Sequence, residues 1–313
     1  MTASTSLPIS AAGARHRRPS RLQRTILAWY EERGRSLSFR ATRDPWAILV
    51  SEVMAQQTQI GRVGPAWATF MARFPTSGAL AAASSADVLR AWSGLGYNRR
   101  AVALQRAAVL IEERHGGRVP DDLSALEALP GVGLYTARAV ASLAFGRPVG
   151  AVDVNVRRVL TRLASPIAEP MPPGRLQAIA DALVPRDRST DWTHALMDLG
   201  ATLCRPVSPR CDGCPARSAC AFGRSSGARQ PTAERRSRAP DLPFERTSRW
   251  LRGRIVRRLA AAPDGAWLVV EGPIGTHDET AVRLALRALE ADGLVELAAD
   301  ERRARLPAMA LEV

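Results

Sequence analysis

The four cysteines of this chain constrain its fold more than any other feature. They are Cys204, Cys211, Cys214 and Cys220, spaced C-x6-C-x2-C-x5-C, and no cysteine occurs elsewhere. Four thiolates on one compact loop are suitable ligands for a soft metal or an iron–sulfur cluster. We therefore expect residues 204–220 to wrap a metal centre in a single loop.

Disulfides and zinc are the alternatives for these cysteines. No apolar run is long enough to span a bilayer, and the first residues lack the apolar stretch of a signal peptide. We therefore expect a soluble cytoplasmic, nucleoid-associated protein, where disulfides are rare. Structural zinc sites usually pair two short knuckles, whereas only one C-x2-C is present. The spacing favours a 4Fe-4S cluster.

All 44 basic side chains counted as lysine or arginine are arginines, and the formal net charge is +14. Such a charge suits a polyanionic partner, because arginine neutralises phosphate and releases counterions. An arginine-rich composition without any such partner is the alternative. The absence of lysine excludes an enzyme that works through a lysine Schiff base.

The pattern of apolar residues predicts a mainly α protein. Residues 1–20 are expected to be a disordered basic tail, and residues 21–222 a helical core. The composition of residues 223–245 is that of a linker. In residues 246–313 a helix, a short strand, a helix and a hairpin are expected, which is the outline of a winged helix.

A glycine-rich loop links two apolar helices in the core. It contains Gly131, Val132 and Gly133, and twenty residues after it comes Asp153. Backbone N–H groups at the start of the second helix would attract phosphate. An ordinary helix turn is the alternative for this loop alone. The order of hairpin, apolar helix, aspartate and four-cysteine loop is far more specific.

This constellation resembles the iron–sulfur helix-hairpin-helix glycosylases, a family that includes endonuclease III and the A/G-mismatch adenine glycosylases. The adenine branch is closer, on the segments Ser51–Gln59, Gly94–Tyr97, Asp153–Val156 and Ala195–Ala201. The resemblance implies a six-helix barrel domain with an iron–sulfur domain. It also implies double-stranded DNA with a mispaired or damaged base as the partner, and we expect a monomer without membrane contact.

Breaking an N-glycosidic bond requires one carboxylic acid and one carboxylate in different environments. Glu52 lies in an apolar helix, where burial should raise its pKa and make it a general acid. Asp153 lies near a helix start, where it would stay ionised and stabilise an oxocarbenium-like sugar. A surface glutamate and a plain N-cap are the structural alternatives. Tyr135 is expected near the acid, and Asn155 beside a catalytic water.

Other residues are assigned by the resemblance. Gln56 and Gln57 would contact the flipped or opposing base, and Tyr97 would be an aromatic wedge beside the estranged base, or else a core aromatic. The base pocket would be lined by Phe39, Arg40, Ala55 and His194. Here the chain departs from its family, because Ser38–Phe39 replaces Pro-Trp, Ala55 replaces Leu, and His194 replaces Gln or Glu. These changes would reshape the pocket.

Three functions remain open. The first is a monofunctional glycosylase that removes adenine opposite 8-oxoguanine or G; the second is a related enzyme for thymine, uracil or hypoxanthine. The third is a non-catalytic iron–sulfur DNA-binding protein, which would have no need of both Glu52 and Asp153. A lyase is disfavoured, because the family's lyases carry a lysine where Tyr135 stands here.

The Nudix-like C-terminal domain that is usual in the adenine glycosylases would also need more residues than follow the linker here.

Overall fold

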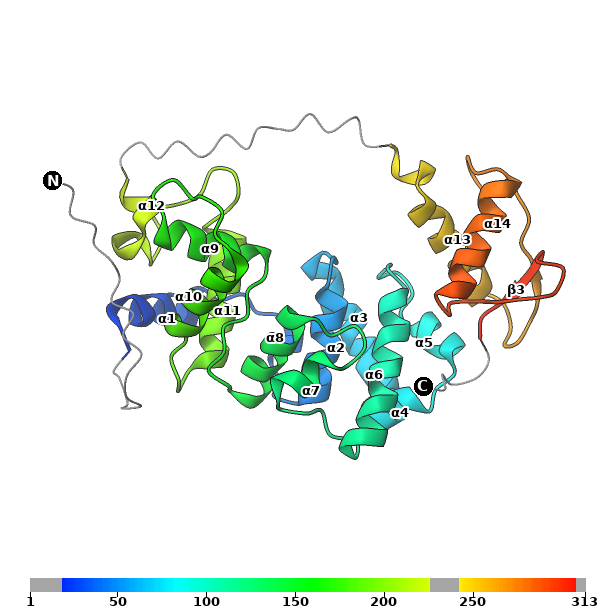
Figure 1. Ribbon diagram of the computed structural model, residues 1–313, viewed down its shortest axis with the longest axis horizontal. Helices are drawn as coiled ribbons and strands as arrows, with labels where there is room; N and C mark the ends of the chain where they lie inside the picture. The colour runs from blue at the N-terminus through cyan, green and yellow to red at the C-terminus, as the bar shows by residue number, and fades with distance from the viewer. Residues whose placement is uncertain (1–18, 226–241, 308–313) are drawn as a thin grey trace.

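The computed structural model describes residues 19–225 and 242–307, and these are mainly helical (Figure 1). The expected tail and linker fall largely outside the described residues. Ser20, however, caps the first helix, so the ordered core begins slightly before the expected boundary. Within the described residues, no helix is both long and apolar enough to cross a membrane.

The core helices follow one another with short connections. They are α1 (Arg21–Arg33), α2 (Pro45–Ala55), α3 (Ile60–Arg73), α4 (Ser77–Ala81), α5 (Ser85–Ala91), α6 (Arg99–His115), α7 (Leu123–Glu127), α8 (Leu134–Phe145), α9 (Val154–Ala164), α10 (Pro173–Leu183), α11 (Ser189–Thr202) and α12 (Ala221–Arg224). Short 3₁₀ turns occupy Ser38–Arg40 and Arg217–Ala219.

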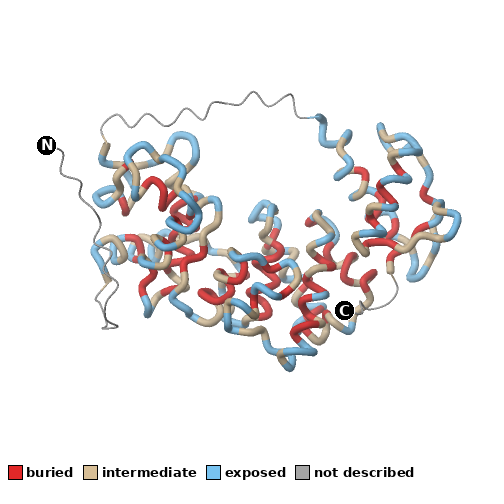
Figure 2. Tube along the Cα trace, viewed as in Figure 1, coloured by how far each residue is buried: buried red, intermediate tan, exposed pale blue. Residues whose placement is uncertain are grey.

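These helices form two neighbouring lobes. In Figure 1, α1 and α9–α12 lie together at one end and α2–α8 lie in the middle, with α2 and α8 side by side. The buried residues, red in Figure 2, lie inside each group of helices. Because α11 packs against α8 as well as α9, it joins the two lobes.

Helix α2 is the most deeply buried helix of the middle lobe. Asp44 caps its first turn and Pro45 occupies a position where its missing N–H costs nothing. Every residue from Trp46 to Met54 is buried, so the helix is enclosed on all sides. Any ionisable residue in this segment is therefore removed from water.

The carboxyl-terminal module, residues 242–307, begins with a 3₁₀ turn at Phe244–Arg246. It continues with α13 (Ser248–Ala260), β1 (Leu268–Val269), α14 (Glu279–Ala291), β2 (Glu296–Leu297) and β3 (Arg303–Arg305). The strands are antiparallel in the order β1-β3-β2. The elements follow the expected order, while the winged-helix assignment itself stays a prediction.

One helix is shorter than the sequence suggested. The apolar pattern of the sequence indicates helix from Ala86 to Leu95, but α5 ends at Ala91. Gly94 and Gly96 adopt positive φ values of 90° and 72°, which end the helix and form a tight loop. Tyr97 follows at φ 48°, an uncommon conformation for a residue with a side chain.

Candidate active site

A cavity of about 890 Å³ opens where α2, α8, α9 and α11 meet. It is lined by twelve of the fourteen residues predicted to act in catalysis, in DNA binding or in the base pocket: Phe39, Arg40, Glu52, Ala55, Gln56, Gln57, Gly131, Gly133, Tyr135, Asp153, Asn155 and His194. Val132 and Tyr97 do not line it. The cavity therefore brings together residues that are widely separated in the sequence.

Glu52 enters this cavity from the buried helix α2 and is only 8% exposed. Burial raises its pKa from 4.5 to about 7, against the opposing effects of Tyr135 and Arg40. The Tyr135 hydroxyl donates a hydrogen bond of 3.0 Å to Oε2 of Glu52. A carboxyl group in this setting can carry and release a proton near neutral pH.

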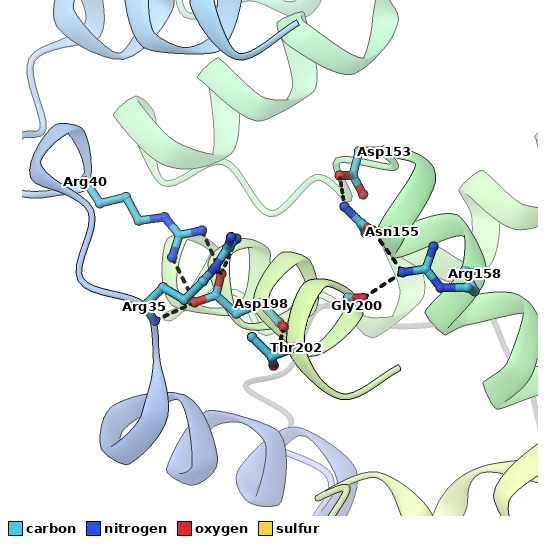
Figure 3. A network of polar contacts seen from close by, with 8 residues as sticks. All are labelled: Arg35, Arg40, Asp153, Asn155, Arg158, Asp198, Gly200 and Thr202. Carbon is cyan, nitrogen blue, oxygen red and sulfur yellow. Dashed lines mark hydrogen bonds and ion pairs between the residues drawn. The ribbon is translucent and has the colours of Figure 1, made fainter. Parts of the chain in front are cut away.

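Asp153 caps the first turn of α9, and its Oδ1 accepts a 2.6 Å hydrogen bond from the backbone N–H of Val156. Its Oδ2 accepts a 3.2 Å bond from the side-chain amide of Asn155. Arg158 donates to the amide oxygen of Asn155 at 2.8 Å, which turns the amide nitrogen toward Asp153 (Figure 3). Asp153 is therefore a helix N-cap, which was the structural alternative, and it also lines the cavity, as the proposed catalytic role requires.

Two residues that support this arrangement were not identified from the sequence. Arg158 also donates to the carbonyls of Gly200 and Cys204, both at 2.6 Å, and so ties Asn155 to α11 and to the cysteine loop. A Cβ added at Gly200 would lie 2.7 Å from Cβ of Asn155, so only glycine permits this helix contact. The position of Arg158 three residues after Asn155, on the same helix face, was the available signal.

Arg40 lines the cavity, but its guanidinium is committed to an ion pair. It donates two hydrogen bonds of 2.9 Å to Asp198, which also accepts from the backbone and side chain of Arg35 (Figure 3). Burial alone opposes the ionisation of Asp198, but the bonds from Arg40 and Arg35 outweigh it and lower its pKa. The network fixes the segment that carries Phe39 against α11.

His194 lies beside this network and is buried. Burial, together with the positive charge of Arg40, lowers its pKa to about 3. The imidazole is therefore neutral near pH 7 and presents one donor and one acceptor nitrogen. A neutral ring at this wall of the cavity can accept or donate a hydrogen bond without adding charge beside Glu52.

The hairpin loop lies at the mouth of the cavity. Gln56 donates to the carbonyl of Gly131 and to the Thr136 hydroxyl, both at 3.2 Å, so α2 and the hairpin are held together. The Val132 N–H donates to the carbonyl of Leu129 at 3.1 Å, so it is engaged within the hairpin turn. The N–H groups of Gly131 and Gly133 donate to no backbone carbonyl within the described residues.

Arg100 joins the end of α2 to the loop that carries Tyr97. Its guanidinium donates to the carbonyl of Gln56 at 2.6 Å and to that of Gly96 at 3.0 Å, and it lies over the Tyr97 ring. Burial lowers its pKa to about 10, so it stays charged. Sequence reasoning missed this residue, because its partners are carbonyl groups that no motif reveals.

The four cysteines come together as expected from their spacing. All four line one small cavity of about 30 Å³ between α9, α11 and α12. Arg162 donates to Sγ of Cys204 at 3.4 Å, and the N–H of Gly223 donates to Sγ of Cys220 at 3.3 Å. Within the described residues, no three His, Cys, Asp or Glu side chains are grouped so that they could hold a metal ion.

Comparisons with known proteins define the class first. Residues 50–186 match the family described as HhH-GPD superfamily base excision DNA repair protein. The structure of a thermostable thymine-DNA glycosylase is 32% identical, has a TM-score of 0.61 and covers 64% of this chain and 94% of its own. A non-covalent endonuclease III–DNA complex, 24% identical with a TM-score of 0.56, shares the fold and covers 64% of this chain and 92% of its own.

The curated relatives narrow this class to one family. The adenine DNA glycosylase of Mycolicibacterium smegmatis is 41% identical, over 88% of this chain and 93% of the relative. That of Mycobacterium tuberculosis is 42% identical, over 94% and 95%. The human enzyme is 41% identical but covers only 63% of this chain and 38% of its own length. The chain belongs to the adenine DNA glycosylase family.

Proposed function

We propose that this chain hydrolyses the N-glycosidic bond of adenine mispaired with 8-oxoguanine or G in double-stranded DNA. The observation that carries the proposal is the pairing of Glu52 and Asp153 in one cavity, the first buried with a pKa of about 7 and the second hydrogen-bonded as a helix cap. The choice of adenine as the excised nucleobase rests on its relatives, which are adenine DNA glycosylases.

The roles of the residues follow from their surroundings. Glu52, protonated by virtue of its burial, donates a proton to a ring nitrogen of the departing base. The Asp153 carboxylate stabilises the cationic sugar, and with Asn155 it positions the attacking water. The flipped base would lie beside Phe39, Ala55 and His194, which all line the cavity.

Strand cleavage is not part of the proposed reaction. The chain contains no lysine, and Tyr135, two residues after Gly133, hydrogen-bonds to Glu52 through its hydroxyl. A phenol cannot form the imine through which such lyases act. The expected product is therefore an intact abasic site.

A 4Fe-4S cluster held by Cys204, Cys211, Cys214 and Cys220 is proposed as the resident cofactor. Each thiolate of such a cluster binds a different iron, so four cysteines are needed around one space. The proposal is supported by the single-loop spacing of the four cysteines and by the one cavity that all four line. Through the Cys204 carbonyl, which Arg158 contacts, its loop would support Asn155.

An excision panel tests the proposal. Duplexes carrying A, T, U or hypoxanthine opposite 8-oxoguanine, G, C or T are incubated with excess protein and then treated with alkali. We expect excision of A opposite 8-oxoguanine or G, strand breaks only after alkali, and no adduct trapped by borohydride. Preferred removal of thymine, the base named for the structural neighbour, would replace the substrate but retain the reaction class.

A further inference from the structure

The carboxyl-terminal module is fixed to the middle lobe by polar contacts. Arg90 of α5 donates to the carbonyls of Ala260 and Ala262 at 3.1 and 3.2 Å and pairs with Asp264. The N–H of Ala86 donates to the carbonyl of Pro307 at 3.0 Å. Buried apolar residues of the module join the core of the preceding helices. The module therefore has a defined position relative to the cavity.

That position is next to Tyr97. Arg249 of α13 stacks on the Tyr97 ring, 4.2 Å from its centroid, and donates a 2.5 Å hydrogen bond to its hydroxyl. Tyr97 is linked through Arg100 to Gln56 at the rim of the cavity. A continuous series of contacts thus leads from the cavity to α13, which lies on the side of the module that faces α6 (Figure 1).

The exposed side of α13 is strongly basic. The α13 arginine face is defined here as five exposed residues: Arg246 in the 3₁₀ turn before the helix, and Arg249, Arg254, Arg257 and Arg258 within it. Among the described residues, none of the five forms an ion pair within 4.0 Å, whereas Arg283 and Arg287 of α14 pair with Glu279 and Glu301. The opposite side of α13 is buried in the module, while on the exposed side Arg249 stacks on Tyr97 and Arg254 lies over Trp250.

We propose that the α13 arginine face binds the phosphate backbone of duplex DNA, on the far side of Tyr97 from the cavity. The inference rests on the proposed function, because it takes duplex DNA as the substrate. Guanidinium groups that have no carboxylate partner can neutralise phosphates, and binding phosphates releases counterions. The module thereby lengthens the DNA contact of the glycosylase core.

Two double variants of equal charge test this inference. Arg254→Ala/Arg257→Ala removes two members of the face, and Arg283→Ala/Arg287→Ala removes two paired arginines of α14. Both lower the net charge equally and leave buried positions intact. Binding is measured by fluorescence anisotropy between 50 and 200 mM salt, using a duplex with a tetrahydrofuran abasic analogue that no glycosylase can process.

For the α13 variant, we expect the slope of log affinity against log salt to become shallower by about 1 to 2. We also expect it to lose hydroxyl-radical protection of the outermost phosphates. The α14 variant should match the unmodified chain in both measurements. Equal slopes and footprints for the two variants would overturn the inference. Adenine excision by the unmodified chain, measured in parallel, reports on the proposed function independently.

Discussion

The Tyr135 hydroxyl lies 3.0 Å from Oε2 of Glu52 and donates a hydrogen bond to it, so the first turn of α8 directly contacts the buried carboxyl group. This bond stabilises the ionised form of Glu52, whereas burial favours the protonated form. Burial has the larger effect, and the pKa settles at about 7. The phenol thus keeps the proton available for transfer near neutral pH.

The first prediction concerns the pH dependence of excision. A general acid must be protonated, so the single-turnover rate should fall as the pH rises above about 7. Replacing Tyr135 by Phe removes a hydrogen bond that lowers the pKa of Glu52, so this alkaline limb should move to higher pH. Rate profiles between pH 5 and 9 for both proteins provide the measurement. An unmoved limb, or one displaced to lower pH, would show that Tyr135 does not tune the acid.

The second prediction concerns stability. Because the folded pKa of Glu52 is raised from 4.5 to about 7, the folded state holds this proton longer than the unfolded state. Stability is therefore lost as pH rises through this interval, by up to about 3 kcal/mol. Glu52→Gln should increase the urea midpoint at pH 8 much more than at pH 4.5. The control is Glu127→Gln at an exposed position, which should leave the urea midpoint unchanged at both pH values. An equal increase of the urea midpoint by Glu52→Gln at both pH values would refute the raised pKa of Glu52.

The third prediction concerns the hairpin. An added Cβ at Gly133 meets nothing within 4 Å, whereas at Gly131 it would meet Ala103 at 2.9 Å in a backbone of positive φ. Gly133→Ala should therefore leave the fold intact but weaken DNA binding, because the methyl group obstructs a phosphate at the start of α8. Gly174→Ala, at another helix start with open space around it, is the matched control. Equal affinities for the two variants would mean that phosphate does not approach Gly133.

The fourth prediction concerns the metal centre. Protein purified in air should be yellow-brown and contain about four iron and four sulfide per chain, as a 4Fe-4S cluster requires. Replacing Cys214 by Ser should remove the colour and lower the iron content together, because this thiol lines the common cavity. Colourless protein with stoichiometric zinc would contradict the cluster assignment.

Local patterns made part of the site predictable. The burial of Glu52 could be expected because its neighbours in the helix are apolar, and Asp153 could be placed at a helix start because a strongly amphipathic helix follows it. The start of helix at residue 21 and the apolar helix after the hairpin also agreed with the sequence, because the capping residue Ser20 and the apolar run from Leu134 are local signals. Each of these features depends on only a few residues that are neighbours in the sequence.

Contacts between distant segments could not be predicted. Arg249 and Tyr97 are 152 residues apart, and nothing in either segment signals the other. The need for glycine at position 200 depends on how closely α9 approaches α11. The internal bond made by the Val132 N–H depends on the turn geometry of the hairpin. Each depends on tertiary packing rather than on local propensity.

The most direct test of the account is a comparison of Glu52→Gln and Asp153→Asn with the unmodified chain in single-turnover excision of adenine. Each variant keeps the shape of its side chain and removes either the transferable proton or the charge. We predict that each loses at least about 10²-fold in rate while affinity for the tetrahydrofuran duplex is retained. Normal excision by Glu52→Gln would contradict the general acid, and normal excision by Asp153→Asn would contradict the stabilised sugar cation.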